Sequence, residues 1–310
     1  MDWFIQQTFA VTIAIILDRV FGEPRRFHPL VGFGLCASRV QAYLNQGEHR
    51  FAKGIFGWCI LVVPFAWGAG VIHWSLPTVG AVGLSAVITW FSIGGKSMQQ
   101  HAQAVARPLQ AGLLEQARLR VSYIVSRDCE SMNEQQIASA TVESVLENGQ
   151  DAVFGAIFWS FCLGPLGGVL FRLANTLDAM WGYRTEQYRY FGCFAAHMDD
   201  VLGFVPARLT ALSYCLCGQF RLGWQCWRTQ ARQCASPNGG PVMCAGAGAL
   251  AIIIGGPAQY FGKLKDKPFM GCGKTVTGPD IERSCQLLWR AQLLWLAVTW
   301  SFVILWAWLG

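Results

Sequence analysis

Three carboxylates recur at a spacing of four residues near the middle of the chain. They are Glu143, Glu147 and Asp151, with Asn148 beside them. Residues four apart lie on one face of an α-helix, and like charges on that face repel unless solvent, a cation or a metal ion faces them. Because Mg²⁺ on a nucleotide takes one or two carboxylates together with phosphate and water, the stripe suits a Mg²⁺–nucleotide site. It also suits a solvated helix face just outside a membrane, and spacing alone favours that alternative.

Asn175 and Asp178 form a second polar group, because a spacing of three also places them on one helix face. There Asp178 can hold a cation or orient an arginine. The same residues equally suit a capped helix end, and the spacing does not separate the two alternatives.

The adjacent acids Asp199 and Asp200 lie between apolar residues, and Arg208 begins an apolar run. Burying acidic side chains among apolar residues costs free energy unless the carboxylates are solvated or paired with a cation. An arginine can bind a carboxylate or phosphate through two hydrogen bonds, or it can extend to lipid headgroups. The convergence of both signs of charge near a membrane edge favours a functional site.

Two further motifs carry weaker signals. Asn238, Gly239 and Gly240 belong to a Pro- and Gly-rich turn whose N–H groups could cradle a phosphate. The chain has no GxxxxGK[ST] motif, and the pattern alone favours an ordinary turn. His28 is a candidate acid or base, although a lone histidine more often has a structural role.

The elements that must position these residues are long and apolar. Only 14% of the 310 residues are charged, 53% are hydrophobic and the mean hydropathy is +0.34. A soluble globular protein carries about 25% charged residues. Asp, Glu, Lys and Arg are absent from residues 54–95, 152–171, 233–262 and 291–310. Because a spanning helix needs about 20 apolar residues, the sequence predicts an all-α, polytopic helical membrane protein.

We expect a single integral-membrane domain over residues 1–310. Its apolar segments are predicted at about 3–17, 55–74, 78–94, 152–171, 209–220, 242–256 and 291–310. Residues 95–151 are expected to form a polar helical layer, in which Ser131 and Glu134 have the spacing of a capping box. The run Gly-Pro-Leu-Gly-Gly at 164–168 breaks one apolar segment, which is therefore either a kinked span or a re-entrant pair.

The loops are basic and give the chain its net charge of +6. The positive-inside rule then places them in the cytoplasm and the uncharged turn at 75–77 outside, which requires at least one hairpin that does not span. No nucleic-acid-binding pattern accompanies the charge. The twelve cysteines include no CxxC pair, so free thiols are expected rather than a metal cluster.

Taken together, these motifs resemble the adenosylcobinamide-phosphate synthase family of cobalamin biosynthesis (CobD/CbiB) over about residues 13–290. The most specific matches are Ser126-Arg127-Asp128, VESVLEN at 142–148, ANTLDAMWGY at 174–183, Asp199-Asp200 and VPARLTAL at 205–212. LDRVFGEP at 17–24, followed by His28-Pro29, is similar to the family's first motif. The glycine turn departs from the family pattern because it lacks a tryptophan and its second proline is shifted.

The resemblance implies an ATP-dependent ligase in a bacterial inner membrane, with its active site on the cytoplasmic side. The family joins a propionate carboxylate of adenosylcobyric acid to the amine of (R)-1-aminopropan-2-yl phosphate, or a related aminoalcohol, and forms adenosylcobinamide phosphate. An acyl phosphate is the expected intermediate. ATP and Mg²⁺ are the implied cofactors. Membrane lipid is an expected partner, together with other cobalamin-assembly enzymes.

The resemblance also implies residue roles. Glu143, Glu147, Asp151 and Asp178 are expected to hold Mg²⁺–ATP. Arg184 and Arg208 would stabilise the transferring phosphoryl group, and Asp199 or Asp200 would accept a proton from the amine. Contacts to the bound cofactor are expected from His28, Asn148, Asn175, Asn238, Gly239 and Gly240. Lys263, Lys265 and Lys267 would attract the aminoalcohol phosphate or the corrinoid.

Two other classes of protein remain as alternatives. A membrane-bound regulatory protein of the related β-lactamase-induction type would share the general architecture, but it would not need the whole motif series between 174 and 212. A transporter would explain broken helices, but the sequence contains no clear inverted repeat.

Overall fold

The computed structural model describes residues 3–24, 28–183, 185–260 and 262–309. The chain divides into two compact units. Unit 1 comprises residues 1–95, 151–203 and 300–310, and unit 2 comprises residues 96–150 and 204–299.

The described residues include five helices that are long and apolar enough to cross a membrane. They are Trp3–Phe21, Arg50–Ser75, Thr78–Gln110, Cys193–Cys217 and Gly278–Trp308. The prediction of an all-α, multi-pass membrane protein is therefore confirmed.

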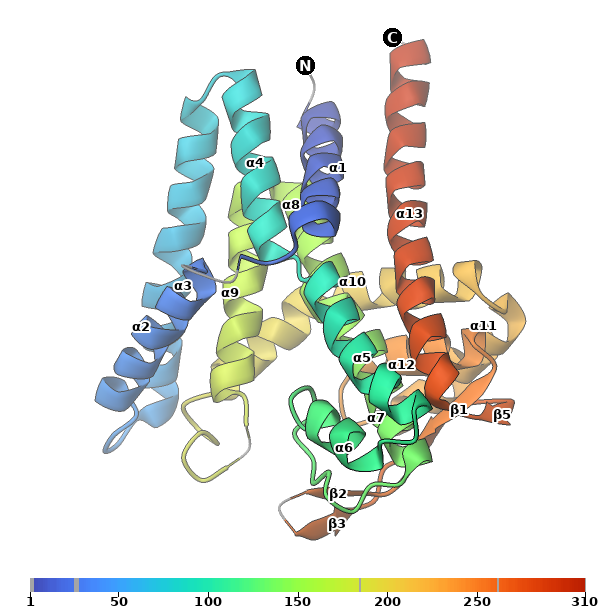
Figure 1. The fold of residues 1–310 in the computed structure, drawn as a ribbon. Coiled ribbons are helices and arrows are strands. Elements are labelled where there is room, and N and C mark those ends of the chain that lie inside the picture. The colour runs from blue at the N-terminus through green and yellow to red at the C-terminus, as the bar shows by residue number, and fades with distance from the viewer. Residues whose placement is uncertain (1–2, 25–27, 184, 261, 310) are drawn as a thin grey trace. The chain divides into compact units, whose positions relative to one another are not determined.

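Unit 1 is built from helices. Its elements are α1 (Trp3–Phe21), α2 (Pro29–Leu44), α3 (Arg50–Ser75), α4 (Thr78–Ser92), most of the π-helix η1 (Gln150–Phe154), α8 (Gly155–Leu163), α9 (Pro165–Trp181), the first part of α10 (Cys193–Cys217) and the end of α13 (Gly278–Leu309). Figure 1 shows α3 and α4 as a hairpin closed by a short turn, and α9 contacts both. A Cβ on Gly70 of α3 would lie 3.1 Å from Leu166 of α9, so the small residue permits this close packing.

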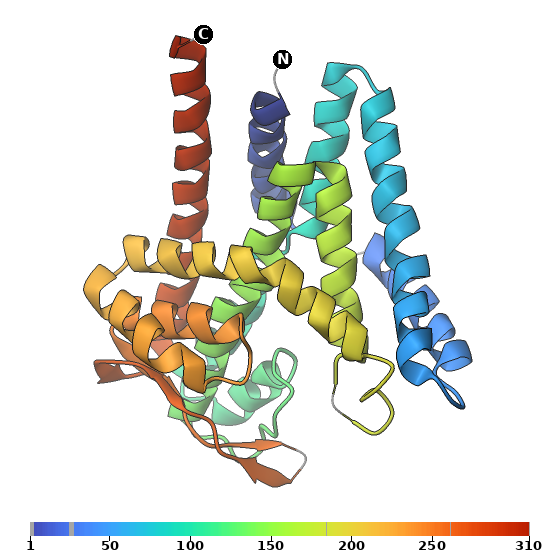
Figure 2. The same ribbon diagram turned by 180° about the vertical axis from the view of Figure 1, so that it is seen from behind.

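The broken apolar segment at 152–171 forms a helical hairpin rather than one kinked helix. α8 and α9 pack against each other, as their yellow-green ribbons in Figure 2 show. The chain reverses at Gly164, whose φ of 62° lies in the left-handed region that favours glycine. Pro165 then begins α9, because its fixed φ suits the first turn of a helix. A Cβ on Gly167 would lie against the backbone carbonyl of Trp159, so the two helices approach closely.

Unit 2 combines helices with short strands. Its helices are α5 (Gly95–Gln110), α6 (Leu114–Val121), α7 (Glu134–Gly149), the remainder of α10, α11 (Phe220–Gln230), the 3₁₀ turn η2 (Ala231–Gln233), α12 (Gly239–Ala249) and the first part of α13. The strands are β1 (Ile252–Gly255), β2 (Ala258–Tyr260), β3 (Lys263–Lys265), β4 (Phe269–Gly271) and β5 (Lys274–Thr275). β1 pairs antiparallel with β4 and parallel with β5, whereas β2 and β3 form a separate antiparallel hairpin.

The apolar segment expected at 242–256 divides between α12 and β1. α12 has 11 residues and every one of them is buried, whereas a membrane-spanning helix needs about 20. Its glycines and alanines let neighbours approach: a Cβ on Gly246 would lie 2.5 Å from the Leu146 side chain of α7. Protein therefore surrounds this apolar helix within unit 2.

The capping box of α7 lies two residues farther along than the sequence predicts. Asn133, not Ser131, is the N-cap: its side chain accepts the N–H of Gln136, and the Gln136 side chain accepts the N–H of Asn133, both at 2.9 Å. Asparagine and glutamine satisfy the two free donors as well as the serine and glutamate of the predicted pair. The helix consequently begins at Glu134.

Candidate functional site

An ion triad in unit 2 consists of Glu143 of α7, Arg127 and Lys267. The Glu143 carboxylate accepts hydrogen bonds from Arg127 Nη2 at 2.9 Å, from Lys267 Nζ at 2.8 Å and from the Ser139 hydroxyl at 3.0 Å. The Glu143 side chain is 2% exposed, and those of Arg127 and Lys267 are 11% and 22% exposed. A buried carboxylate needs such partners because an unpaired charge in the interior is very costly.

The two cations determine the protonation state of Glu143. Burial by itself would raise the pKa of this carboxyl group. The Lys267 ammonium and the Arg127 guanidinium outweigh that effect and hold the pKa of Glu143 below its ordinary value of 4.5. Glu143 is therefore ionised at neutral pH, and the triad carries one net positive charge.

Glu147 lies one turn farther along α7 than Glu143. Its carboxylate lies next to the first residue of α12. A Cβ on Gly239 would lie against the Glu147 carboxylate, so glycine is needed at that position. The helix N-terminus carries a partial positive charge that favours a carboxylate there. Burial nevertheless raises the pKa of Glu147, with Lys267 opposing and Glu143 adding to that effect.

The turn before α12 uses its own N–H donors. Those of Asn238 and Gly239 donate to the Ser236 hydroxyl at 3.3 and 2.9 Å, and that of Gly240 donates to the Ser236 carbonyl at 3.1 Å. The Arg208 guanidinium holds the same turn through Asn238 Oδ1 at 2.5 Å and the preceding carbonyl oxygen at 2.9 Å. In this structure Arg208 therefore positions the turn, and the turn's N–H groups are already engaged.

Three carboxylates of unit 1 lie close enough to influence one another. Asp178 is on the last turn of α9, and Asp199 and Asp200 are on α10. Asn175 Nδ2 donates to Asp199 Oδ1 at 3.1 Å. Burial, followed by repulsion from Asp200, raises the pKa of Asp178 from 3.8 to about 6. A carboxyl group with a pKa near neutrality can exchange a proton or hold a cation at physiological pH.

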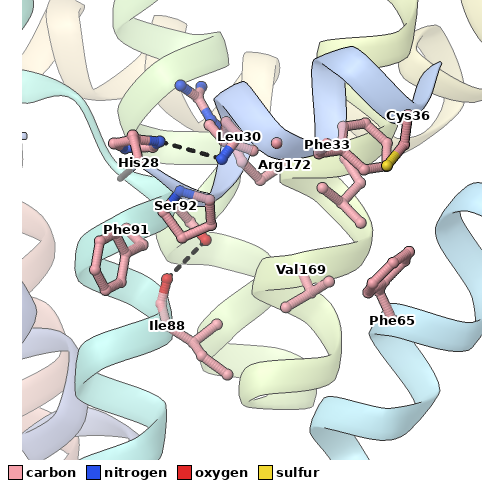
Figure 3. A pocket seen from close by; sticks show the side chains of 13 residues that line it. His28, Leu30, Phe33, Cys36, Phe65, Ile88, Phe91, Ser92, Val169 and Arg172 are labelled. Carbon is pink, nitrogen blue, oxygen red and sulfur yellow. Dashed lines mark hydrogen bonds between the residues drawn. The ribbon is translucent and has the colours of Figure 1, made fainter. Parts of the chain in front are cut away.

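A hollow of 480 Å³ in unit 1 is lined by residues of α2, α3, α4 and α9. Figure 3 shows Phe33, Phe65 and Phe91 around it, with His28 and Arg172 together on one side. Its volume falls within the range of about 300–1,000 Å³ that is usual for ligand pockets. The aromatic walls suit an apolar part of a ligand, and the two nitrogen-bearing side chains give it one polar side.

His28 is the N-cap of α2. Its Nδ1 accepts the N–H of Leu30 at 3.2 Å, as the dashed line in Figure 3 shows. Burial lowers the pKa of His28 below its ordinary 6.5, Glu23 partly offsets this, and the charge of Arg172 lowers the pKa further. His28 is consequently neutral at pH 7, and its Nδ1 acts as a hydrogen-bond acceptor.

Comparison with known proteins assigns the family. The CobD/Cbib protein family model matches residues 11–288. The chain belongs to the CobD/CbiB family. It is 46% identical to cobalamin biosynthesis protein CobD of Chromobacterium violaceum, over 94% of this chain and 96% of that protein. It is 45% identical to CobD of Stutzerimonas stutzeri, over 92% and 94% of the two chains, and 36% identical to cobalamin biosynthesis protein CbiB of Salmonella arizonae, again over 92% and 94%. No solved structure matches the chain.

The carboxylates predicted to hold Mg²⁺ in this CobD/CbiB chain are distributed over both units. Glu143 and Glu147 belong to unit 2, whereas Asp151 and Asp178 belong to unit 1. Within the described ranges, no three His, Cys, Asp or Glu side chains gather as ligands of one ion. Glu143 is paired with two cations instead. The four-carboxylate metal site stays a prediction.

Other predicted positions of the CobD/CbiB motifs also stay predictions. Arg184 lies outside the described residues. Asn148 is exposed, and its side chain donates to the carbonyl and the hydroxyl of Ser144 at 2.8 and 3.0 Å.

All twelve cysteines are free thiols, as the absence of CxxC pairs indicates.

Sequence reasoning did not assign a role to Arg127 or Ser139. Arg127 belongs to the motif Ser126-Arg127-Asp128, which supplied the signal but not the partner. Ser139 bridges Glu143 and the N–H of Gly255, which it accepts at 2.8 Å. That N–H is 116 residues away in the sequence, so no local pattern could indicate the contact.

Proposed function

We propose that this member of the CobD/CbiB family is an ATP-dependent acid–amine ligase. The family has its role in cobalamin biosynthesis. The proposed reaction joins adenosylcobyric acid to (R)-1-aminopropan-2-yl phosphate, or a related aminoalcohol phosphate, and gives adenosylcobinamide phosphate. The protein would act in the bacterial inner membrane with its polar groups facing the cytoplasm.

The observation that carries the proposal is the carboxyl group of Asp178, whose pKa is raised to about 6 by burial and by Asp200. The attacking amine is an ammonium ion at neutral pH and must lose a proton before it can form an amide. A carboxylate with a pKa near the operating pH is suited to accept that proton. Asp199 and Asp200 lie in the same cluster and share this role in the proposal.

The overall chemistry balances as two group transfers. The substrate carboxylate oxygen first takes the γ-phosphoryl group of ATP and ADP leaves, which replaces a poor oxide leaving group by phosphate. The amine nitrogen then forms the C–N bond, phosphate leaves, and the amine gives up its proton.

Mg²⁺ would shield the phosphate charges of the nucleotide during the first transfer. The donor set fits this ion, because Mg²⁺ needs only one or two carboxylates when phosphate and water complete its shell. Of the predicted ligands, Glu143 fits this role least, because Arg127 and Lys267 already neutralise its charge.

A coupling assay tests the proposed function. Detergent-purified full-length protein is supplied with adenosylcobyric acid, aminopropanol phosphate, ATP and Mg²⁺, and the corrinoid product is followed by mass. Adenosylcobinamide phosphate with one ADP per product is the expected result. Formation of AMP instead of ADP would indicate that the activated intermediate is an acyl adenylate and not an acyl phosphate.

The remaining outcomes distinguish the alternatives. Corrinoid binding without product from any aminoalcohol phosphate would contradict the ligase activity. No product and no corrinoid binding would favour the regulatory protein. ATP hydrolysis that depends on neither co-substrate would instead favour a transporter.

A further inference from the structure

The hollow of 480 Å³ in unit 1 has apolar residues at its border that are open to the surroundings of the protein. Phe65 is 56% exposed, and Gly32 is exposed as well. Phe65 and Phe91 belong to the helices Arg50–Ser75 and Thr78–Gln110, which are long and apolar enough to cross a membrane. Exposed apolar surface on a membrane-spanning helix meets acyl chains rather than water. The hollow is therefore accessible to lipid.

The polar side of the hollow has two N–H donors that the protein leaves unused. Within the described residues, neither Arg172 Nε nor His28 Nε2 has a hydrogen-bond partner, although both atoms are buried. His28 Nδ1 accepts the N–H of Leu30, so the neutral ring carries its proton on Nε2. Buried donors are nearly always paired, because an unpaired one costs free energy. The two donors therefore indicate a ligand that brings its own acceptor.

The charges around Arg172 favour a zwitterionic ligand over an anionic one. Glu23 and Asp151 are close enough to act electrostatically on the Arg172 guanidinium. One cation facing two carboxylates leaves an excess of negative charge on this side of the hollow. A ligand that carries only negative charge meets repulsion there, whereas an ammonium group next to a phosphate compensates it.

The volume and the walls of the hollow select one chain of a lipid. The hollow has the size of a pocket for a drug-sized ligand, and adenosylcobyric acid, a cobalt macrocycle with an attached adenosyl group, is far larger. ATP would add a triphosphate to a side that already has excess negative charge. One acyl chain can lie against Phe33, Phe65 and Phe91, which Figure 3 shows around the hollow, while the rest of the lipid stays in the bilayer.

We propose that the hollow binds one phospholipid whose headgroup carries an ammonium group, with an acyl chain between α2, α3, α4 and α9 and the phosphate towards Arg172 and His28. The inference goes beyond the proposed ligase activity and does not depend on it. It gives His28 a lipid phosphate as its ligand, in place of the cofactor contact that the sequence predicts.

Native mass spectrometry of delipidated, full-length protein in detergent tests the site without ATP or corrinoid. The probes are phosphatidylethanolamine, phosphatidylglycerol, diacylglycerol, which lacks the headgroup, and glycerophosphoethanolamine, which lacks the chains. Phosphatidylethanolamine is expected to bind as one molecule, about 10-fold more tightly than diacylglycerol or phosphatidylglycerol, because a hydrogen bond to a charged group is worth about that factor. The headgroup alone should not bind measurably. Phosphatidylethanolamine should also raise the Tm, because it binds the folded state.

Gly32→Leu narrows the hollow without a clash. A Cβ on Gly32 meets nothing within 4 Å, and leucine is a better helix former than glycine, so the variant should fold. We expect its affinity for phosphatidylethanolamine to fall about 10-fold or more, because displacing about two methylene groups of the chain costs that factor. Gly83→Leu on α4 is the matched control, because a Cβ there also meets nothing within 4 Å and Gly83 does not line the hollow.

Arg172→Gln removes the charged donor and keeps the apolar walls. Its affinity for phosphatidylethanolamine should fall about 10-fold, whereas its affinity for diacylglycerol should stay unchanged, which also shows that the hollow is still folded. Arg39→Gln is the control, because Arg39 is exposed on α2 and does not line the hollow. This control should bind phosphatidylethanolamine as wild type does.

Several outcomes would overturn the lipid site. Equal affinity of wild type for phosphatidylethanolamine and diacylglycerol would show that the two donors face water rather than a phosphate. Equal affinity of Gly32→Leu and wild type would place the bound lipid elsewhere. Tighter binding of phosphatidylglycerol would contradict the choice of a zwitterionic headgroup.

Competition separates the lipid site from the proposed function. Displacement of the lipid by adenosylcobyric acid or by the aminoalcohol phosphate would assign the hollow to a substrate and overturn the inference. A protein that binds phosphatidylethanolamine as expected but forms no amide product would support the lipid site and remove only the ligase.

Discussion

At the scale of single residues, the surroundings of Glu143 and of Asp178 have opposite effects on the pKa of each carboxyl group. Glu143 is buried against two cations and stays ionised, whereas Asp178 is buried against Asp200 and takes up a proton near neutrality. The same stripe of carboxylates that suggests a metal site therefore contains at least one residue whose charge is already neutralised. These contrasting surroundings give opposite expectations for stability.

Glu143→Gln is expected to destabilise the protein strongly. The substitution leaves Arg127 and Lys267 facing a neutral amide, and breaking a buried ion pair costs about 3–5 kcal/mol. Thermal unfolding of purified protein measures the change. Glu115→Gln is the control: Glu115 pairs with Arg118 but its side chain is 83% exposed, so a change within about 1 kcal/mol is expected. Similar losses in both variants would contradict the structural role of the triad.

The Glu143 pKa also predicts a response to acid. A carboxyl group whose pKa is lowered on folding stabilises the folded state above its unfolded pKa, and that contribution disappears as the pH falls through the folded pKa. The stability difference between wild type and Glu143→Gln should therefore be constant above about pH 5 and shrink below about pH 4.5. A difference that stays constant down to pH 3 would show that the charge of Glu143 is not its source.

Asp178→Asn is expected to stabilise the protein while impairing ligation. Its pKa is raised on folding from 3.8 to about 6, so the ionised group opposes folding above that range and the penalty fades as the pH falls. The gain in Tm should be larger at pH 8 than at pH 5. Asp266→Asn is the control, because Asp266 is exposed, and only a small change in Tm is expected from it. Full ligase activity of Asp178→Asn would remove its proposed role as proton acceptor, and a loss of Tm at pH 8 would contradict the raised pKa.

At the scale of elements, close helix packing depends on individual glycines. The α8–α9 hairpin is the clearest example in the described residues of unit 1, because its reversal needs the positive φ of Gly164 and its packing needs Gly167 against the Trp159 carbonyl. In unit 2, hydrogen bonds hold a turn in place: Arg208 and Ser236 bind the turn that leads into α12.

Gly167→Ala is expected to destabilise the hairpin. The added methyl group would meet backbone atoms that cannot rotate away, so the helices must separate, at a cost of about 1–3 kcal/mol. Gly83→Ala on α4 is the matched control, because a Cβ there meets nothing within 4 Å and alanine is the better helix former. Thermal unfolding should show a lower Tm for the first variant and an unchanged or higher Tm for the second. The opposite order would contradict the close packing.

At the scale of the whole molecule, the five apolar helices found among the described residues and the basic loops define a multi-pass membrane protein. Its CobD/CbiB membership covers residues 11–288, which include the motifs of both units. The topology with basic loops in the cytoplasm follows from charge alone and has a direct test.

Reporter fusions test that topology. Alkaline phosphatase, which is active only outside the cytoplasm, should be active when fused after Pro77, at the uncharged turn between α3 and α4. Fusions within the α2–α3 loop at residues 45–49, or within residues 185–192, should be inactive, and green fluorescent protein should give the reverse pattern. An active phosphatase at 185–192 would overturn the cytoplasmic assignment of this region.

The sequence by itself determined the class of protein, the family and most helix positions. Charge-free runs of about 20 residues leave a membrane helix as the stable state, because only a helix satisfies its own backbone there. The same local information located the acids at 143, 147, 178, 199 and 200. It missed the strands between 252 and 275, which are too short to leave a periodic signal.

Only the tertiary structure decided what those residues face. Glu143 meets Lys267, 124 positions away, and Asp178 is influenced by Asp200 on another helix. Asp128 Oδ2 accepts the backbone N–H of Gly262, 134 residues away. A carboxylate's pKa, partner and availability to a ligand depend on charges and burial within a few ångströms, and chain folding sets these distances independently of sequence spacing.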